Sequence, residues 1–124
     1  MTKKIVIDLD ETISSKIEGQ SYESALPRGD VIARMRQYSE MGFEICIFTA
    51  RNMRTFEGNI GKINAHTLPI IIEWLAKHNV PYDEIIVGKP WCGHNGFYVD
   101  DRAIRPSEFL RLSPQEIDML LKDG

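Results

Sequence analysis

An apolar run that ends in two acidic residues constrains this chain most. Residues 5–7 are Ile-Val-Ile, a β-branched run that predicts a buried strand, and Asp8 and Asp10 follow where that strand meets solvent. A buried strand end cannot hold two ionised carboxylates without partners, because unpaired buried charge is costly. Open α/β sheets bind ligands outside the carboxyl ends of their strands. The run therefore predicts a site at such an edge, where a metal ion, a substrate cation or solvent would meet the acids.

The composition predicts one globular domain that spans residues 1–124. Hydrophobic residues make up 43% and charged residues 27% of the chain, which is ordinary for a soluble globular protein. The net charge of −3 makes nucleic acid an unlikely partner, and no apolar run is long enough for membrane insertion. Cys46 and Cys92 form no disulfide framework or metal pattern, which favours a reducing, cytoplasmic location.

Strand and helix patterns alternate along the chain. We expect strands at residues 4–9, 43–48, 84–87 and 96–99, and helices at 30–41, from Thr67 to about residue 78, and from Ser113 onward. Residues 50–66 are polar and predict a loop, although apolar spacing leaves the start of the next helix open back to Ile63. This alternation predicts an α/β fold, a three-layer sandwich around a central parallel sheet with right-handed crossovers.

Polar residues follow each predicted strand. They are Asp8, Asp10 and Thr12 after the first, Thr49 and Arg51 after the second, Lys89 after the third, and Asp100 and Asp101 after the fourth. Because parallel strands end at one edge of a sheet, we expect acids, a hydroxyl and an ammonium to converge there. Such a set offers carboxylates for Mg²⁺, donors for phosphate oxygens and one spare nucleophile, which phosphoryl transfer needs.

Four motifs in this order resemble the haloacid dehalogenase superfamily of phosphotransferases. The pattern Asp-x-Asp-x-Thr at residues 8–12 matches its first motif, Thr49 its second, Lys89 its third and residues 100–101 its fourth. The match runs from residue 4 to about residue 105, and it implies a Rossmann-like core. Residues 88–106 also resemble a small subfamily labelled capsule-biosynthesis phosphatases.

The resemblance implies a role for each matched residue. Asp8 would attack phosphorus and form an aspartyl-phosphate, while Asp10 would protonate the leaving oxygen and later activate water. The Asp8 carboxylate, the Asp10 main-chain carbonyl and Asp100 would hold Mg²⁺, and Thr49 would donate to the phosphoryl group. Two like unit charges about 4 Å apart repel by about 4 kcal/mol at an effective dielectric of about 20, so Mg²⁺ and Lys89 must offset that repulsion.

Other polar residues near the motifs carry less specific predictions. Asp101 would support the metal or orient Lys89, or would merely close a turn. Thr12 would close the turn after the nucleophile. Arg51, with other basic residues, could recognise an anionic substrate, and a solvated basic rim is an equal alternative. For His94 a structural hydrogen bond is favoured over a catalytic role.

The short chain predicts a member without a cap domain. Residues 13–27 and 52–66 are the only spare segments, and neither can bury a core of its own. We therefore expect an open site, suited to a phosphate on a glycan, a lipid-linked sugar or a nucleic-acid end. A loop or a second subunit in a homo-oligomer could close it over a small sugar phosphate.

Together these patterns predict a cytoplasmic, Mg²⁺-dependent phosphomonoester hydrolase acting on a phosphorylated small molecule or glycan. The narrower resemblance implies a sugar- or polysaccharide-precursor phosphate in capsule biosynthesis. A polynucleotide 3′-phosphatase is the nearest alternative, and the acidic charge balance argues mildly against it. A receiver-like signalling module is disfavoured because its acidic pair follows the first strand and its phosphoacceptor a central one. A glycosyltransferase and a binding protein without turnover are the remaining alternatives.

Overall fold

The computed structural model describes residues 3–123, and the chain divides into two compact units, Met1–Trp91 and Cys92–Gly124. The expectation of one domain over residues 1–124 stays a prediction. No helix among the described residues is both long enough and apolar enough to cross a membrane.

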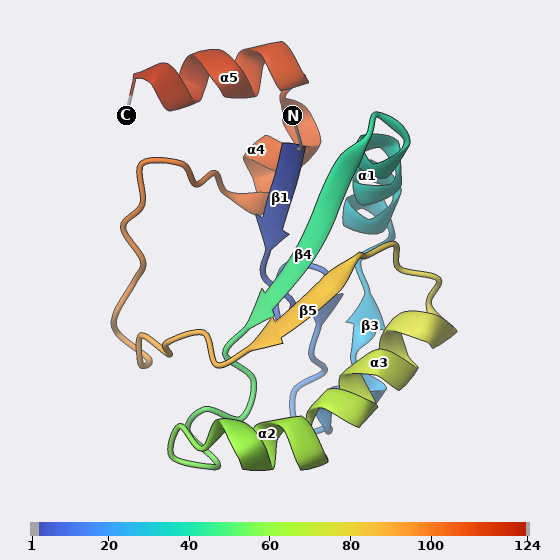
Figure 1. Cartoon of the computed structure of the whole chain (residues 1–124), viewed down its shortest axis with the longest axis vertical. Coiled ribbons are helices and arrows are strands. Elements are labelled where there is room, and N and C mark those ends of the chain that lie inside the picture. Colours follow the sequence, from blue (N-terminus) through green and yellow to red (C-terminus); the bar gives the residue numbers. More distant parts are fainter. Residues whose placement is uncertain (1–2, 124) are drawn as a thin grey trace. The chain divides into compact units, whose positions relative to one another are not determined.

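A parallel three-stranded sheet forms the centre of the first unit (Figure 1). Its strand order is β1-β4-β5, with bounds Lys3–Ile7, Phe43–Thr49 and Glu84–Val87. The register aligns Ile7 with Ile47 and Ile47 with Ile85. Because all three strands run the same way, their carboxyl ends meet at one edge, as predicted. The α/β class is confirmed, and the helices beside the sheet agree with a three-layer Rossmann-like core.

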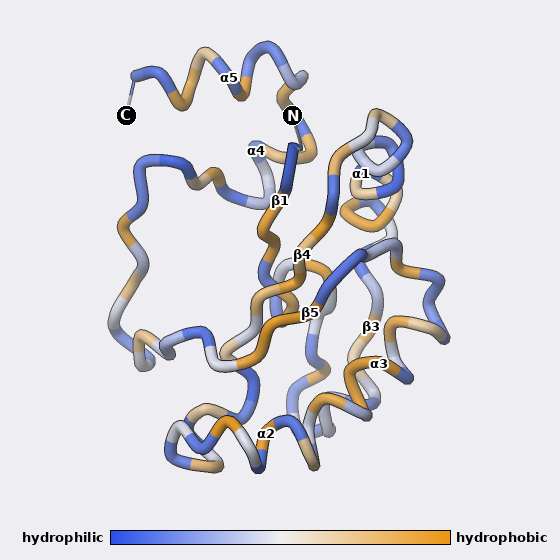
Figure 2. Tube along the Cα trace, in the orientation of Figure 1, coloured by the Kyte–Doolittle hydropathy of each residue, from blue (hydrophilic) through white to orange (hydrophobic). Residues whose placement is uncertain are grey.

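Helices form both crossovers of this sheet. Helix α1 (Gly29–Glu40) connects β1 to β4, and helices α2 (Ile60–His66) and α3 (Leu68–Lys77) connect β4 to β5. Helix α1 contacts β4 and helix α2 contacts β5, and Figure 2 shows hydrophobic colour over part of each strand. The buried set includes Val31, Ile32, Met35, Tyr38, Ile45, Ile47, Ile71, Trp74 and Leu75.

A small hairpin occupies the spare segment after the first motif. Strands β2 (Ser14–Ser15) and β3 (Leu26–Pro27) pair antiparallel, and the 3-10 helix η1 (Tyr22–Ser24) lies between them. Two-residue strands cannot enclose a core. The prediction of a fold without a cap is therefore confirmed for the described residues.

Helix α2 corrects the prediction of a loop over residues 50–66. The Asn59 side chain accepts a hydrogen bond from the Lys62 amide at 3.0 Å, which caps the helix, and Ile63 within the helix is fully buried. Seven residues with little apolar periodicity gave too weak a helical signal. Thr67 precedes α3 as expected, but its hydroxyl donates to Asn52 at 2.7 Å and does not cap that helix.

The second unit contains two helices, α4 (Pro106–Arg111) and α5 (Pro114–Lys122). The predicted capping box opens α5, since the Glu116 amide donates to the Ser113 hydroxyl at 3.1 Å and the Ser113 amide donates to the Glu116 carboxylate at 3.0 Å. Helix α4 was not predicted from the sequence.

The prediction of a fourth strand at residues 96–99 is wrong. These residues form an extended loop without a strand partner among the described residues, drawn in orange in Figure 1. Phe97 and Val99 are 80% and 88% exposed. A strand forms only where a neighbour takes up its amide and carbonyl groups, and no neighbour pairs with this segment.

Candidate active site

A tight turn after β1 positions the two acids of the first motif. The main-chain carbonyl of Leu9 accepts hydrogen bonds from the amides of residues 12–14, at 2.9 to 3.2 Å. Leu9 itself is fully buried, and Glu11 takes a left-handed conformation with φ of 62°. This anchored turn leaves Asp8 and Asp10 on either side of a fixed core residue, so that both carboxylates are held at the sheet edge.

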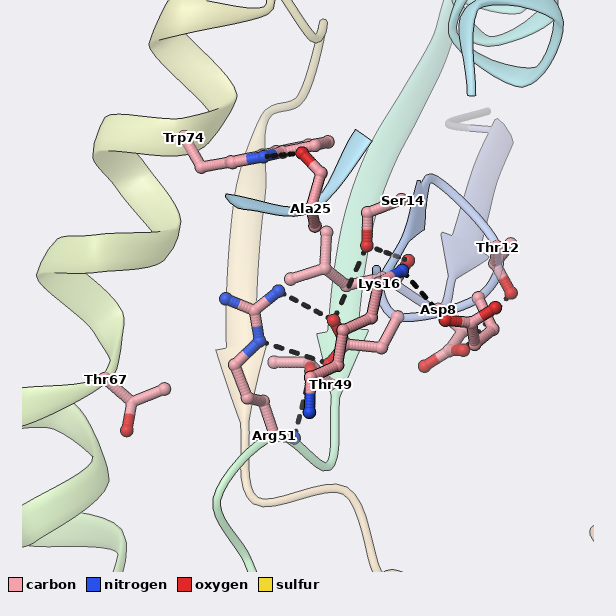
Figure 3. A network of polar contacts seen from close by, with 12 residues as sticks. Asp8, Thr12, Ser14, Lys16, Ala25, Thr49, Arg51, Thr67 and Trp74 are labelled. Atoms are coloured by element: carbon pink, nitrogen blue, oxygen red, sulfur yellow. Dashed lines mark hydrogen bonds and ion pairs between the residues drawn. The ribbon is translucent and has the colours of Figure 1, made fainter. Parts of the chain in front are cut away.

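The Asp8 carboxylate lies between a cation and a hydroxyl. Lys89 Nζ is 3.5 Å from Asp8 Oδ1, and Thr12 Oγ1 donates to Asp8 Oδ2 at 3.2 Å. Lys89 is fixed from behind, because its amide donates to the Thr49 carbonyl at 3.1 Å. Figure 3 shows Asp8, Thr12 and Thr49 in this region. The carboxyl ends of β1, β4 and β5 therefore all contribute to one cluster, as the motif order predicted.

Opposing effects act on the ionisation of Asp8. Burial raises the pKa of the Asp8 carboxyl, while the nearby Lys89 ammonium and the Thr12 hydroxyl lower it. The Asp8 side chain keeps 34% of its surface exposed, so a substrate can reach it. A partly desolvated carboxylate beside an ammonium is a suitable nucleophile for an anionic ester, since the cation attracts the substrate toward it.

Asp10 forms a two-pronged ion pair with Arg51. Arg51 Nη2 donates to Asp10 Oδ1 at 2.7 Å and Arg51 Nε donates to Asp10 Oδ2 at 3.1 Å. The Ser14 hydroxyl adds a weak contact to Oδ1 at 3.5 Å. The Arg51 side chain is only 2% exposed and Asp10 is 23% exposed. Arg51 is therefore a buried partner of the first motif and no part of a solvated rim. Sequence spacing could not show this, because the two residues lie far apart in the chain.

The same guanidinium also borders a pocket. Its carbon lies 4.4 Å from the centre of the Tyr22 ring, and the Arg51 amide donates to the buried Thr49 hydroxyl at 3.1 Å. Arg51 Nη1 is buried and has no hydrogen-bond partner among residues 3–123. The pocket measures about 220 Å³ and is lined by Ser21, Tyr22, Glu23, Arg51, Asn52, Thr67 and Ile70. Buried donors without a partner are rare in folded proteins.

The structure brings most of the predicted residues together. Those from the first unit are Asp8, Asp10, Thr12, Thr49, Arg51 and Lys89. Asp100 and Asp101 belong to the second unit, where Asp100 Oδ1 accepts a hydrogen bond from the Arg102 amide at 2.8 Å. Their convergence with Asp8 stays a prediction. Tyr22 was not predicted, since nothing in its spacing distinguishes it from an ordinary loop aromatic.

The first motif also offers oxygen ligands for a hard cation. Among the described residues there is no cluster of three His, Cys, Asp or Glu side chains that could hold a metal ion. Mg²⁺ needs no such cluster, because it binds through one or two carboxylates and completes its shell with carbonyls, water and phosphate. The Asp8 carboxylate and the Asp10 main-chain carbonyl are donors of this type, so the residues present fit the ion.

Comparisons with known proteins define the family and support the fold. No protein-family model and no curated protein matches the chain. The crystal structure of an MCSG target from Vibrio cholerae is 61% identical, covers 98% of each chain and superposes with a TM-score of 0.94. The chain therefore belongs to the same family as that Vibrio cholerae protein.

Two more distant structures share the fold alone. They are chains of a Pnkp1/Rnl/Hen1 complex and of a Pnkp1/Rnl/Hen1 RNA repair complex, with 21% and 16% identity and TM-scores of 0.53 and 0.50. The matches cover 89% and 98% of this chain. The chain spans only about a third of those longer chains, 34% and 30% respectively.

Proposed function

We propose that the protein is a phosphomonoester hydrolase of the haloacid dehalogenase type, with Asp8 as its nucleophile. The observation that carries this proposal is the 3.5 Å approach of Lys89 Nζ to Asp8 Oδ1 at the carboxyl edge of the sheet. Thr12 and Thr49 supply hydroxyls at the same edge. A reachable carboxylate with an adjacent ammonium and hydroxyls suits attack on a phosphate ester.

The reaction divides into two transfers of the phosphoryl group. An Asp8 oxygen forms a bond to phosphorus as the bond from phosphorus to the leaving oxygen breaks, and Asp10, which must enter this step protonated, gives that oxygen its proton. Water then attacks the aspartyl-phosphate, Asp10 takes the proton of that water, and phosphate leaves with Asp8 restored. Lys89 would stabilise the phosphate charge throughout, and Thr49 would donate to a phosphate oxygen.

Mg²⁺ is the proposed cofactor, held by the Asp8 carboxylate, the Asp10 main-chain carbonyl and Asp100. When bound, it would supply the positive charge that lets a carboxylate approach a phosphate dianion. Asp101 would support the metal ligands.

Arg51 would act on both Asp10 and the substrate. Its two hydrogen bonds fix the orientation of the Asp10 carboxylate, which must meet the leaving oxygen in one direction. Arg51 also lines the adjoining pocket, which would receive the leaving group. That leaving group would be the sugar or polysaccharide precursor of a phosphate in capsule biosynthesis, and the free thiols of Cys46 and Cys92 suit a cytoplasmic enzyme.

A polynucleotide 3′-phosphatase is the second candidate. The likeness of this fold to chains of an RNA repair complex favours it, while the net charge of −3 opposes binding to a polyanion. A panel of sugar phosphates, glycerol phosphates and 3′-phosphorylated oligonucleotides separates the two candidates by kcat/KM. Preference for the oligonucleotide would replace the sugar phosphate proposal.

Phosphate release from p-nitrophenyl phosphate, with and without Mg²⁺, tests the enzyme class. We expect Mg²⁺-dependent release by the wild type and none above background by Asp8→Asn. Asp118→Asn is the matched control, since Asp118 forms an ion pair with Lys122 on the surface of α5 and its replacement should leave the rate unchanged. Equal release by the wild type and Asp8→Asn would exclude Asp8 as the nucleophile.

A further inference from the structure

An aromatic ring from the hairpin lies against the guanidinium that binds Asp10. The ring belongs to Tyr22 on the 3-10 helix η1, and its centre is 4.4 Å from the Arg51 guanidinium carbon. Tyr22 is half-buried and Arg51 is buried. Cations lie over aromatic rings because the face of the ring carries partial negative charge. The contact therefore connects the hairpin to the proposed acid and base through Arg51.

The hairpin that carries Tyr22 is anchored on both sides of η1. Before η1, the Lys16 amide donates to the Glu11 carboxylate at 3.0 Å. After η1, the Trp74 indole nitrogen donates to the carbonyl of the buried Ala25 at 3.0 Å (Figure 3). Helix η1 itself contacts helix α3. Because both of its flanks are held, the place of the ring is set by packing within the fold.

The ring and Asp10 hold different parts of Arg51. Asp10 binds one edge of the guanidinium, through Nη2 at 2.7 Å and Nε at 3.1 Å. The edges of a guanidinium bind hydrogen-bond acceptors, whereas its faces stack on aromatic rings. Two bonds along one edge fix the group within its own plane but leave it free to tilt out of that plane. A ring 4.4 Å from its central carbon opposes the tilt.

The ring also limits the access of water to the ion pair. Tyr22 and Arg51 both line the pocket of about 220 Å³, yet the Arg51 side chain is only 2% exposed. A smaller side chain at position 22 would enlarge this pocket toward the guanidinium and admit water. Water raises the local dielectric and so weakens the attraction between Arg51 and Asp10.

We propose that Tyr22 is a positioning residue for Asp10 and acts through Arg51. Its ring keeps the guanidinium in the orientation that binds the Asp10 carboxylate, so that the carboxylate stays directed at the leaving oxygen. The effect on catalysis rests on the proposed phosphatase function, in which Asp10 is the acid and base. The effect of the ring on the ion pair does not.

Proton exchange at Arg51 Nε tests the contact without reference to activity. This N–H donates to Asp10, so its exchange with water, followed by NMR, reports opening of the pair. We expect exchange to be about tenfold faster in Tyr22→Leu than in the wild type and unchanged in Tyr22→Phe, which keeps the ring. Helix η1 contains no buried residue, so both variants should fold.

Lys16→Gln is the matched control for this measurement. The Lys16 ammonium lies 4.7 Å from the centre of the same ring, but its side chain is exposed, and its loss should leave exchange at Arg51 unchanged. The Arg51 signal is identified by its absence from Arg51→Lys. Exchange at the wild-type rate in Tyr22→Leu overturns the proposal, and so does exchange in Tyr22→Phe as fast as in Tyr22→Leu.

Kinetics on glycerol phosphate test whether the contact affects the reaction, since its leaving oxygen needs a proton. We expect Tyr22→Leu to lower kcat about tenfold with little change in KM, and Tyr22→Phe to retain the wild-type kcat. In the Arg51→Lys background, which lacks the two hydrogen bonds to Asp10, Tyr22→Leu should lower kcat by less than about twofold further. Equal losses in both backgrounds overturn the role through Arg51. A wild type without activity would instead contradict the phosphatase proposal, and proton exchange would still decide the contact.

Discussion

Two segments of this chain have the same pattern and different structures. Residues 5–8 and residues 97–100 are both short apolar runs that end in an aspartate. The first forms β1, and its acid joins Lys89 in a cluster. The second is an extended loop with exposed Phe97 and Val99. An apolar run thus shows that a strand is possible, and the availability of a neighbouring strand decides whether it forms.

The two runs also differ in how they are connected to the chain. The chain from β1 to β4 includes helix α1, which is long enough to bring the two strands together in parallel. The chain from β5 to residue 96 includes no helix.

Replacing Asp8 or Asp100, the acids that end the two runs, should have the largest effects on kcat. We expect Asp8→Asn to lower kcat by about ten-thousandfold or more, because an amide cannot attack phosphorus. Asp100→Asn should lower it by about a hundredfold to a thousandfold and raise the Mg²⁺ concentration needed for half-maximal rate, since a metal ligand would be lost. Steady-state rates over a Mg²⁺ titration measure both effects.

The metal dependence separates the two acids. Only Asp100→Asn leaves the nucleophile intact, so excess Mg²⁺ should recover part of its rate and none of the rate of Asp8→Asn. Wild-type kinetics for Asp100→Asn would mean that the second run has no part in the site.

Lys89 tests the cluster that the first run forms. Lys89→Ala removes the ammonium 3.5 Å from Asp8, and we expect kcat to fall by about a hundredfold to a thousandfold. Its loss should also raise the pKa of Asp8, because Lys89 lowers that pKa. The acid limb of the profile of kcat/KM against pH should therefore move to higher pH. Lys122→Ala, on the exposed face of α5, is the control. An unchanged acid limb would show that Lys89 does not influence the ionisation of Asp8.

The sequence was sufficient where local pattern and strand order carry the information. Parallel strands that end in polar residues predicted the shared edge of Asp8, Thr49 and Lys89, and the structure confirms that arrangement. It was insufficient where a contact joins residues distant in the chain. Nothing in the spacing of Arg51 indicated its two hydrogen bonds to Asp10, because these depend on how the turn after β1 and the end of β4 meet.

The assignment of secondary structure was limited for a related reason. Helix α2 depends on one cap and one buried isoleucine, and the seven residues of that helix show little periodicity by themselves. The run at residues 96–99 has strong strand propensity, yet its conformation depends on a partner that local sequence cannot reveal.

Arg51→Lys tests whether the two-pronged ion pair of Arg51 supports Asp10. A lysine cannot donate two parallel hydrogen bonds, so Asp10 would lose its fixed orientation. We expect kcat to fall by about tenfold to a hundredfold and the free energy of unfolding to fall by roughly 1–3 kcal/mol. Arg34→Lys on the surface of α1 is the control. Unchanged kcat with reduced stability would show that the Arg51–Asp10 ion pair has a purely structural role.

The smallest expected effect is on the stability of the fold, and it arises from burying the charged Asp8 carboxylate. Burial raises the pKa of Asp8 above its ordinary value of 3.8, so the folded state binds this proton more tightly than the unfolded state does. Ionisation of Asp8 therefore lowers stability as pH rises from about 3.8 through the raised pKa, and the cost then persists at neutral pH. Asp8→Asn removes that cost.

We accordingly expect Asp8→Asn to unfold at a higher temperature than the wild type at pH 7. The rise should be about 1–2 °C, because the side chain is a third exposed and water screens much of the effect. The difference should vanish near pH 3, where Asp8 is protonated and both side chains are neutral. Thermal unfolding at the two pH values measures it. A lower unfolding temperature for Asp8→Asn at pH 7 would show that the contacts of Asp8 with Lys89 and Thr12 stabilise the fold by more than the burial of its charge destabilises it. The acid that ends the first run would then lower the stability of the fold by nothing.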